Sequence, residues 1–209
     1  MTPGSTEGME AATAERRRGR PRSDRARAAI LAAGQALFLE RGLDGVTVDE
    51  IADRAGASKA TIYRWWPSKE HLAVDALYDD WLSHAGPEND EVPLEQELEG
   101  YLVPWVRALR RRPYGRVVAG LVARAQLDPA FAEHYRTWFV RRRRDHVGRI
   151  LRRRIADGDL PATTDVPLAL DLIFGPIYHR LLHGHAPVNE PYVRAIVRTV
   201  VRGLLRPNG

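Results

Sequence analysis

Residues 48–65, VDEIADRAGASKATIYRW, predict two short helices that meet at a glycine. The apolar residues of the first helix recur at the spacing of one helix face: Val48, Ile51, Ala52 and Ala55. Gly56 follows them, at a position where a left-handed backbone favours glycine. Ser58 can then cap the second helix by accepting a hydrogen bond from a free backbone N–H. The stretch therefore predicts two helices joined by a tight turn.

The second helix, expected over residues 59–65, has little to bury. Ile62 is expected to point inward, whereas four polar or cationic side chains face outward: Lys59, Thr61, Tyr63 and Arg64. Two helices joined in this way, the second exposed, form a helix-turn-helix. We therefore expect the second helix to bind the major groove of DNA.

The residues before this motif predict another helix and a cap. Ser23 or Asp24 is expected to begin a helix that runs to about Arg41, because its apolar residues return at helical spacing. Thr47 and Glu50 then have the spacing of a capping box at the start of the first motif helix. The motif is thus expected to be the second half of a three-helix unit.

The composition is that of a globular protein, with 44% hydrophobic residues among 209. No apolar run approaches the length of a transmembrane helix, and the polar N-terminus has no apolar core of a secretory signal. Cysteine is absent, which excludes disulfides and thiolate ligands. We expect a cytoplasmic protein without a cofactor.

The net charge of +5 is unevenly distributed, with arginines crowded near the N-terminus and acidic residues near the middle. Residues 1–22 lack an apolar period, and we expect a disordered basic arm. Its segment RGRPR, at residues 18–22, resembles the core of an AT-hook. The arm is expected to place three arginines in a narrow minor groove: Arg18, Arg20 and Arg22. The alternative is a solvated tail that only attracts phosphate.

The rest of the chain predicts only helices, and no window shows sustained alternation. Their expected ranges are 69–84, 94–111, 114–126, 128–157, 165–184 and 190–205. An acidic linker is expected at about residues 85–93. We therefore expect an all-α fold with the arm over residues 1–22, a helix-turn-helix head over 23–68 and an effector-binding and dimerisation domain over 69–209, in which helix 69–84 connects the two.

Residues 23–75 resemble the head of the TetR family of bacterial transcriptional regulators. Phe38 and Gly42 match the end of the family's first helix, and residues 47–70, TVDEIADRAGASKATIYRWWPSKE, match its motif without a gap. Residues 171–182, DLIFGPIYHRLL, look like the dimerisation region of one large subgroup. The resemblance implies an all-α homodimer that binds a palindromic DNA operator, and a body that releases the DNA when it binds a small-molecule effector.

Several residues of the motif are candidates for DNA contact. Thr47 and Ser58 lie at helix N-termini, where hydroxyl and backbone N–H groups can meet phosphate oxygens. Lys59, Thr61 and Arg64 project from the recognition helix toward base edges, and Arg64 is expected to bind guanine.

Three further candidates match family positions that usually hold the DNA backbone: Tyr63, Trp65 and Lys69. Phosphate contacts position a protein without specifying sequence. For Tyr63 and Trp65 the alternative is packing within the head, since aromatic rings with a polar tip commonly do both.

The C-terminal body is rich in aromatic residues that return at helical spacing. An aromatic space with a few polar groups is typical of a small-molecule pocket between helices. The expected ligand is mostly apolar, and the candidate contacts are Tyr101, Trp105, Gln126, His134, Tyr135, Trp138, Phe174 and Tyr178. The alternative is ordinary core, because apolar stripes on helices are usually core.

The last two helices carry apolar stripes that would be exposed on a monomer. Packing against a two-fold mate would make a four-helix interface. The expected contacts are Ile173, Ile177, Leu181, Ile196, Val197, Val200 and Leu204. The alternative is core within one chain.

Other patterns favour structural roles. Arginines at residues 141–144 and 152–154 predict a solvated face, paired with acids near residues 95–99, rather than a second DNA surface. His179, His183 and His185 lack a carboxylate at close helical spacing, so we predict no metal site. The sequence contains neither a glycine-rich phosphate loop nor a nucleophile elbow, so no motif indicates an enzyme.

The function predicted by the sequence is therefore regulation of transcription, with repression expected. The alternatives are a nonspecific DNA-compacting protein, favoured only by the arm, and a helical-bundle enzyme. The helix at residues 69–84 belongs to both head and body. We expect it to act as a lever whose far end, near residues 78–82, moves when ligand binds.

Overall fold

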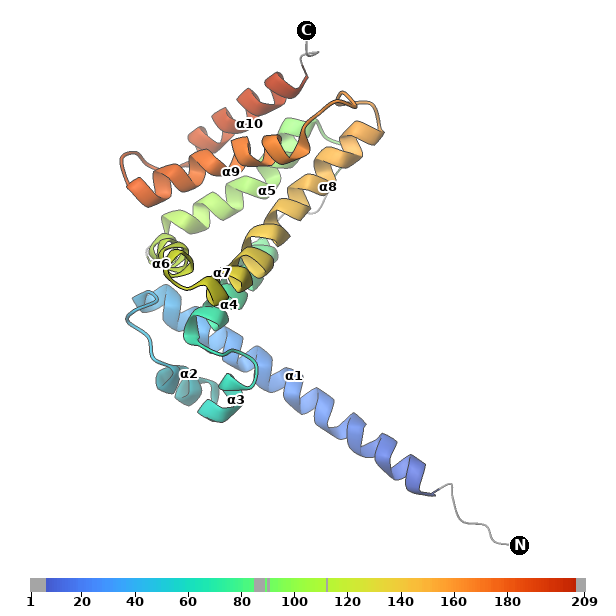
Figure 1. Ribbon diagram of the computed structural model, residues 1–209, viewed down its shortest axis with the longest axis vertical. Helices are drawn as coiled ribbons and strands as arrows, with labels where there is room; N and C mark the ends of the chain where they lie inside the picture. The colour runs from blue at the N-terminus through green and yellow to red at the C-terminus, as the bar shows by residue number, and fades with distance from the viewer. Residues whose placement is uncertain (1–6, 85–88, 90, 112, 206–209) are drawn as a thin grey trace, which may run out of the picture.

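The computed structural model describes residues 7–84, 89, 91–111 and 113–205, without the side chains of residues 7–22 and 80–84. This part of the chain is helical throughout and contains no strand. Figure 1 shows the short helices α2 and α3 beside the long α1 at one end, and a larger body of helices at the other. No helix among the described residues is long and apolar enough to span a membrane. The predicted all-α fold is confirmed.

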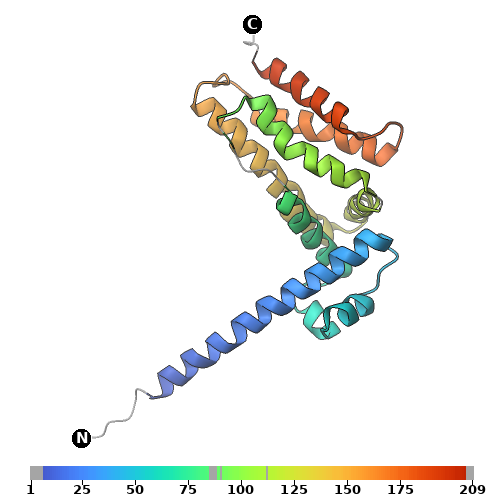
Figure 2. The same cartoon turned by 180° about the vertical axis from the view of Figure 1, so that it is seen from behind.

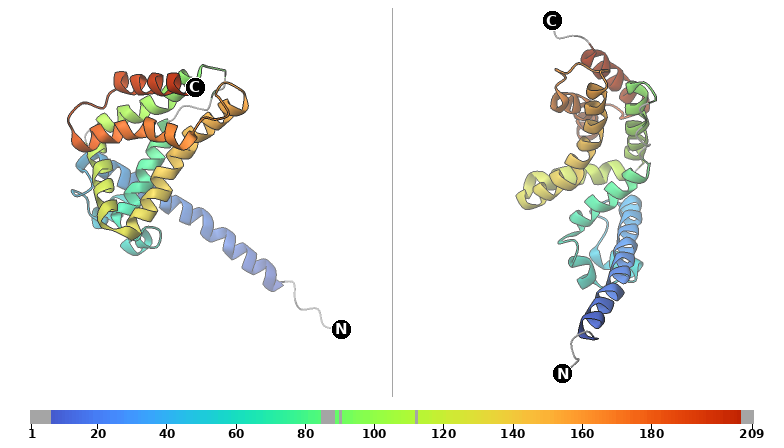
Figure 3. Two further views of the ribbon diagram at one scale, coloured as in Figure 1. Left: turned by 45° about the horizontal axis from the view of Figure 1, so that its top comes forward. Right: turned by 90° about the vertical axis from the view of Figure 1, so that its right-hand side faces the viewer.

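The first helix is longer than the sequence predicts. Helix α1 spans Glu7–Arg41, so the predicted start at Ser23 or Asp24 is wrong, and the arm is helical from Glu7. Alanine, glutamate, methionine and arginine, all strong helix formers, predominate between residues 9 and 18 and continue the helix backward. Figure 3 shows this end of α1 directed away from the body.

The two motif helices are α2, Val48–Ala55, and α3, Lys59–Tyr63. Gly56 has a φ of 61° between them, as predicted for the left-handed turn. Helix α3 ends earlier than the predicted residue 65, because the chain tightens there: the Trp65 amide donates to the Ile62 carbonyl at 3.0 Å. This turn directs Trp66 into the core, where it is 2% exposed.

Helix α4, Lys69–His84, joins the head to the body, and its predicted range is confirmed. Leu72 is fully buried against α1 at Gly34, where an added Cβ would come within 2.3 Å of its side chain. Further along α4, the Leu77 carbonyl accepts a hydrogen bond from Tyr114 Oη of the body at 3.3 Å. The apolar core is therefore continuous from head to body through α4.

The body contains the remaining helices: α5, Leu94–Arg110; α6, Tyr114–Leu127; α7, Pro129–Tyr135; η1, Arg136–Arg141; α8, Arg142–Ala156; α9, Val166–His183; and α10, Glu190–Leu204. These agree with the predicted ranges, except that the helix predicted over 128–157 contains the π-helical turn η1. Figure 2 shows α9 and α10 at the end farthest from α2 and α3, with α5 beside them. The predicted linker lies mostly outside the described residues.

Glu97 of the acidic helix α5 forms ion pairs with two arginines of the basic helix α8, and this pairing was predicted. Glu97 is 6% exposed and accepts hydrogen bonds from Arg153 and, at 2.9 Å, from Arg154. Burial raises the pKa of Glu97, but the two guanidinium groups outweigh it, so the pKa lies below its ordinary value. Because the charge is paired, this buried carboxylate ties α5 to α8.

Candidate nucleic-acid interface and effector site

The N-terminus of α2 is held by the predicted capping box. The Thr47 amide donates to Glu50 Oε2 at 2.8 Å, and the Glu50 amide donates to Thr47 Oγ1 at 3.3 Å. Arg41 adds a hydrogen bond to Glu50 Oε1 at 2.7 Å. The arginine, followed by the Thr47 amide and hydroxyl, lowers the pKa of Glu50 to about 2. The carboxylate therefore stays charged at physiological pH and fixes the start of α2.

Helix α3 presents its predicted outward face. Lys59 and Arg64 are exposed, and Tyr63 is 51% exposed. Ser58 caps the helix, its Oγ accepting from the Thr61 amide at 3.1 Å and lying 2.9 Å from Thr61 Oγ1. Since Ile62 alone is buried among the residues of this helix, its other side chains remain available to a partner.

Lys59 forms an ion pair with Asp49 of α2, with 2.7 Å between Nζ and Oδ1. Both side chains are more than half exposed, so the pair contributes little to stability in water. The hydrogen bond to Asp49 raises the pKa of Lys59. An exposed pair of this kind can exchange its carboxylate for a phosphate or a base edge at low free-energy cost.

Trp65 and Trp66 have different surroundings. Trp66 is buried, and its indole N–H donates to Asp75 Oδ2 at 2.9 Å. Trp65 is half-buried with its ring 5.7 Å from Trp66, and the Arg64 guanidinium lies 4.8 Å from its centroid. Trp65 thus packs on the head and also supports the side chain of Arg64 by a cation–π contact.

The ammonium group of Lys69 is bound within the head. Nζ donates to the carbonyl oxygens of Leu43 and Val46 at 2.9 and 3.0 Å. An ammonium has three donors, so one remains for a phosphate. The side chain therefore joins α4 to the loop between α1 and α2, a contact that the sequence motif did not reveal.

The candidates for DNA contact are gathered at this end of the molecule. The exposed or half-buried members are Thr47, Ser58, Lys59, Thr61, Tyr63, Arg64, Trp65 and Lys69. The side chains of Arg18, Arg20 and Arg22 lie outside the described residues. An exposed, well-capped second helix behind a glycine turn is the arrangement of a helix-turn-helix DNA-binding protein, here with a helical body attached.

Comparison with known proteins identifies the family. A model described as bacterial regulatory proteins, tetR family, matches residues 30–76, and one described as tetracyclin repressor-like, C-terminal domain, matches residues 88–200. The chain is 39% identical to the HTH-type transcriptional regulator YdeS of Bacillus subtilis, over 90% of this chain and 94% of that protein. The chain belongs to the TetR family of transcriptional regulators, which are not enzymes.

Two further relatives agree with this assignment. The DNA-binding transcriptional repressor TetR of Mycobacteroides abscessus is 28% identical over 91% of this chain and 97% of its own length. The crystal structure of the TetR-family transcription regulator SCO0332 superposes with a TM-score of 0.78 at 32% identity, covering 87% of this chain and 99% of that one. The similarity therefore covers head and body together.

The predicted effector residues fall into three groups. Tyr101, Trp105, Tyr135 and Phe174 are buried, and His134 and Tyr178 are half-buried. Trp105 lies 5.9 Å from both Phe174 and Tyr178. Gln126 is exposed in the last turn of α6, so its predicted place in the interior is wrong. Trp138 is 40% exposed and lies at the surface instead.

Arg143, which is not among the residues predicted from the sequence, is 2% exposed in this aromatic interior. Its guanidinium lies 3.9 Å from the centroid of Phe139 and 4.7 Å from that of Trp105. The arginine run at residues 141–144 was assigned to a solvated face as a whole. The overlooked signal is the spacing of four residues that places Arg143 on the same stripe as Tyr135 and Phe139.

Two histidines meet where α4 joins the body. His71 of α4 and His134 of α7 have ring centroids 4.4 Å apart, and the Ser68 Oγ lies 2.9 Å from His71 Nδ1. Burial lowers the pKa of both rings, and the neighbouring His71 lowers that of His134 further. The contact between α4 and α7 is thus between neutral rings at physiological pH.

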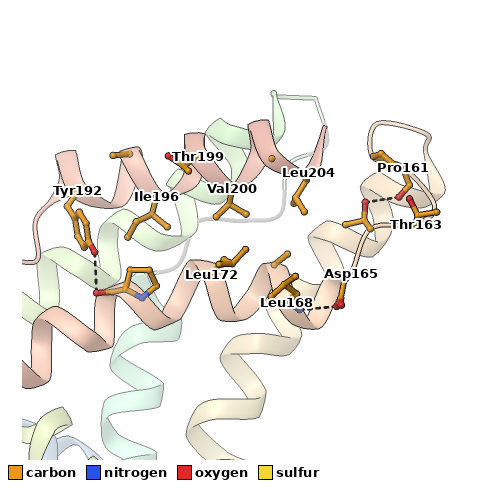
Figure 4. Close-up of a pocket in the computed structure, with 15 residues that line it drawn as sticks. Pro161, Thr163, Asp165, Leu168, Leu172, Tyr192, Ile196, Thr199, Val200 and Leu204 are labelled. Carbon is orange, nitrogen blue, oxygen red and sulfur yellow. Dashed lines mark hydrogen bonds between the residues drawn. The ribbon is translucent and has the colours of Figure 1, made fainter. Parts of the chain in front are cut away.

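The outer face of α9 and α10 carries an apolar groove of about 570 Å³ (Figure 4). Three predicted dimer residues line it, Ile196, Val200 and Leu204. Leu168 and Leu172 of α9 line its other side and are 53% and 48% exposed. Ile196 and Val200 are only 8% and 7% exposed, so most of the exposed apolar surface of the groove comes from Leu168 and Leu172, which were not among the predicted residues.

Three of the predicted dimer residues are core instead. Ile173, Ile177 and Val197 are fully buried within the chain. Leu181 lies outside the groove, near Gly115 of α6. The error has a simple cause: both faces of α9 are apolar, and a stripe shifted by one residue points about 100° away.

The rings of His179 and His183 have centroids 4.7 Å apart, and His185 lies 5.0 Å from His179. Within the described residues, no group of three or more histidine, aspartate, glutamate or cysteine side chains has the arrangement of a metal site. All three histidines are exposed.

Proposed function

We propose that this regulator is a homodimeric repressor that binds a palindromic operator and leaves it when a small molecule binds in the body. The observation that carries the proposal is that two surfaces suited to a partner lie at opposite ends of the molecule. One is the exposed face of α3, and the other is the apolar groove of α9 and α10.

At the DNA end, Arg64 is proposed to bind guanine, with Lys59 and Thr61 at neighbouring base edges. Thr47, Ser58, Tyr63 and Lys69 are proposed to hold phosphates. Trp65 is proposed to position Arg64, in keeping with the 4.8 Å contact between them. Arg18, Arg20 and Arg22 belong to α1, which is helical from Glu7, so an extended arm in the minor groove is not proposed; their charges would add attraction to DNA phosphates beyond the head.

At the other end, the groove is proposed to pack against its two-fold copy. Leu168, Leu172 and Leu204 would be buried there, and two copies of α9 and α10 would form a four-helix interface. Small residues on α10, Ala195, Thr199 and Gly203, also line the groove and would allow the helices to approach closely. A two-fold axis at this end places the two recognition helices for the two half-sites of a palindrome.

Effector binding is proposed to act through α4, which shares its packing with both parts. Its far end contacts the body at Tyr78, where the Arg142 guanidinium lies 5.0 Å from the ring centroid. Its near end begins at Lys69, which is bound to the loop before α2. A displacement at the far end would therefore tilt the head and change the distance between recognition helices.

The first test is selection of bound fragments from a genomic library, followed by titration at increasing salt. A repressor should retain a specific fragment at a salt concentration that releases scrambled DNA, because purely electrostatic binding weakens steeply with salt. Equal affinity for both DNAs at every salt concentration would instead support a nonspecific DNA-compacting protein.

The lever is tested by a distance between the two copies of α3. The chain has no cysteine, so Ala60→Cys, on the exposed side of α3, offers a single labelling position for spin labels. Pulsed dipolar spectroscopy on the dimer should give one distance in the free protein and another with a DNA-releasing ligand. An unchanged distance would exclude the lever.

A further inference from the structure

Arg143 differs from the other arginines of its run. Arg141 and Arg142 are exposed and Arg144 is half-buried, whereas the Arg143 side chain is directed into the body. Its guanidinium stacks on Phe139 and lies close to Trp105, at 3.9 and 4.7 Å from the ring centroids. A positive charge is thus held among aromatic rings, away from water.

The π-helical turn explains how an arginine from a charged run becomes buried. Tyr135, Phe139, Arg143 and Val147 are spaced by four residues and are all buried. In a regular α-helix of 3.6 residues per turn, residues four apart drift steadily around the axis. The wider turn over Arg136–Arg141 offsets this drift and keeps Arg143 in line with Phe139.

A second polar group lies in the same interior. Trp105 is 1% exposed, and its indole N–H has no hydrogen-bond acceptor among the described residues. A buried donor without an acceptor costs free energy, and a ligand that supplies the acceptor recovers it. The centroid of the indole ring lies 5.9 Å from those of Phe174 and Tyr178 and 4.7 Å from the Arg143 guanidinium, so the donor belongs to the same aromatic cluster.

The hydroxyl group of Tyr135, next to this cluster, is neutral. Burial raises the pKa of Tyr135 well above its ordinary value, and its hydrogen bond with Tyr178 acts in the same direction, against the opposing charge of Arg143. The interior therefore offers N–H and O–H donors and one cation, surrounded by flat apolar faces.

We propose that the effector is a planar aromatic anion, a carboxylate or a phenolate, whose oxygen atoms bind the Arg143 guanidinium and the Trp105 indole N–H. The ring system of the ligand would lie among Phe139, Phe174 and Tyr178. A guanidinium matches a carboxylate geometrically and is the usual partner for one away from water. The inference rests on the proposed function only in taking this ligand to be the effector.

The aromatic cluster is connected both to the protein surface and to α4. Tyr178 is half-buried on α9 and its ring centroid lies 5.9 Å from that of Trp105, so the cluster reaches the surface at Tyr178. The neighbouring Arg142 makes cation–π contacts with Tyr78 of α4 and with Trp138, with 5.0 and 4.0 Å between its guanidinium carbon and the ring centroids. Arg142 and Arg143 are consecutive, so a ligand that moves Arg143 also disturbs the contact with α4.

The test compares 2-naphthoate with its neutral amide, 2-naphthamide, as probes of the full-length chain at neutral pH by calorimetry. The naphthoate is expected to bind at least about tenfold more tightly, an advantage of about 1.4 kcal/mol. Arg143→Gln should abolish this preference, and Arg152→Gln, an exposed arginine on the same helix, should leave it intact. Equal binding of the two probes, or binding of neither, would overturn the inference.

Two additional variants protect the test against misfolding. Arg143→Lys keeps the charge but loses the planar fork and should retain part of the preference, and Trp105→Phe keeps a ring but removes the N–H and should weaken naphthoate alone. Circular dichroism reports whether each variant is folded.

The two proposals can fail separately. If naphthoate bound as expected and no DNA were bound selectively, the proposed repressor function would be refuted and the anion site would be supported. Selective DNA binding without anion preference would give the reverse outcome.

Discussion

The head and the body of this regulator are specified in different ways. In the head, most decisive contacts join residues close in sequence: Thr47 with Glu50, Ser58 with Thr61, and the turn at Gly56. In the body, the decisive contacts join distant residues, such as Glu97 with Arg154 and Trp105 with Phe174. Charged side chains of α3 face outward, whereas Arg143 and Arg154 of α8 are buried.

This difference shows why a motif can identify one part of a protein and not the other. Caps and turns depend on a few adjacent residues, so their sequence signal survives without the tertiary structure. An apolar stripe says only that a face is covered and not by what. The caps and turns of the head could therefore be predicted residue by residue, whereas the packing of the body could not be predicted without the tertiary structure.

The largest expected effect tests whether local signals are enough for the head. Phe38→Ala, at a fully buried position of α1, should destabilise the protein by about 3–5 kcal/mol, since it leaves a cavity beneath the motif. Chemical denaturation followed by circular dichroism measures this loss. Leu39→Ala, half-buried next to it, should cost clearly less. Equal losses would mean that packing at Phe38 is not what holds the head.

The next effect concerns the surface of the body that one chain leaves uncovered. Leu168→Glu with Leu172→Glu should dissociate the proposed dimer, because each lost leucine burial is worth about 1.5 kcal/mol or more and charges would be buried. The dimer dissociation constant should rise at least about 100-fold, measured by light scattering after size exclusion. Leu182→Glu, on α9 outside the groove and 46% exposed, should remain dimeric. A wild-type monomer would defeat the dimer proposal.

A smaller effect separates base recognition from phosphate binding within the head. Arg64→Ala should weaken binding to the selected fragment by about 1–3 kcal/mol and relax one base preference. Lys69→Ala should weaken all sequences alike and also lower thermal stability, because its ammonium group holds the Leu43 and Val46 carbonyls. Fluorescence anisotropy on matched and scrambled DNA measures both, with Arg124→Ala in the body as control. Unchanged specificity of the Arg64 variant would refute its assignment.

The cap of α2 should have a measurable effect on stability by itself. Thr47→Ala removes the side-chain oxygen that accepts from the Glu50 amide and should cost about 1 kcal/mol. Thr47→Ser keeps that oxygen and should restore most of the loss in a thermal melt. Should the serine variant be as unstable as the alanine variant, the contribution of the methyl group would outweigh that of the cap.

The smallest effect is the pH dependence of the same cap. The pKa of Glu50 falls from 4.5 to about 2 on folding, so its stabilising contribution is present above pH 4.5 and is lost as the pH falls through about 2. The difference in melting temperature between the wild type and Glu50→Gln should therefore be constant at neutral pH and shrink on acidification. A difference that does not change between pH 5 and 2 would contradict the lowered pKa.

Several expectations that depend on neighbours along the chain are confirmed. The Gly56 turn, the Ser58 cap and the capping box lie where the residues predict them, and α4, α5, α6, α9 and α10 match their expected ranges to within a residue. The family also follows from sequence, since the motif at residues 47–70 is long and uninterrupted. The exceptions are the end of α3, the π-helical turn η1 and the start of α1, where helix formers before Ser23 outweighed the glycines and the proline of the arm.

What the sequence determined by itself is the class of protein, most of the helices and the outward face of α3, because these depend on residues within one or two turns of one another. Only the tertiary structure decided that Ile173 and Val197 face the core, that Lys69 binds the head's own carbonyls, and that Arg143 points inward. Each of these depends on which helix lies opposite, and a helical period of 3.6 residues gives the direction of a side chain but not its neighbour.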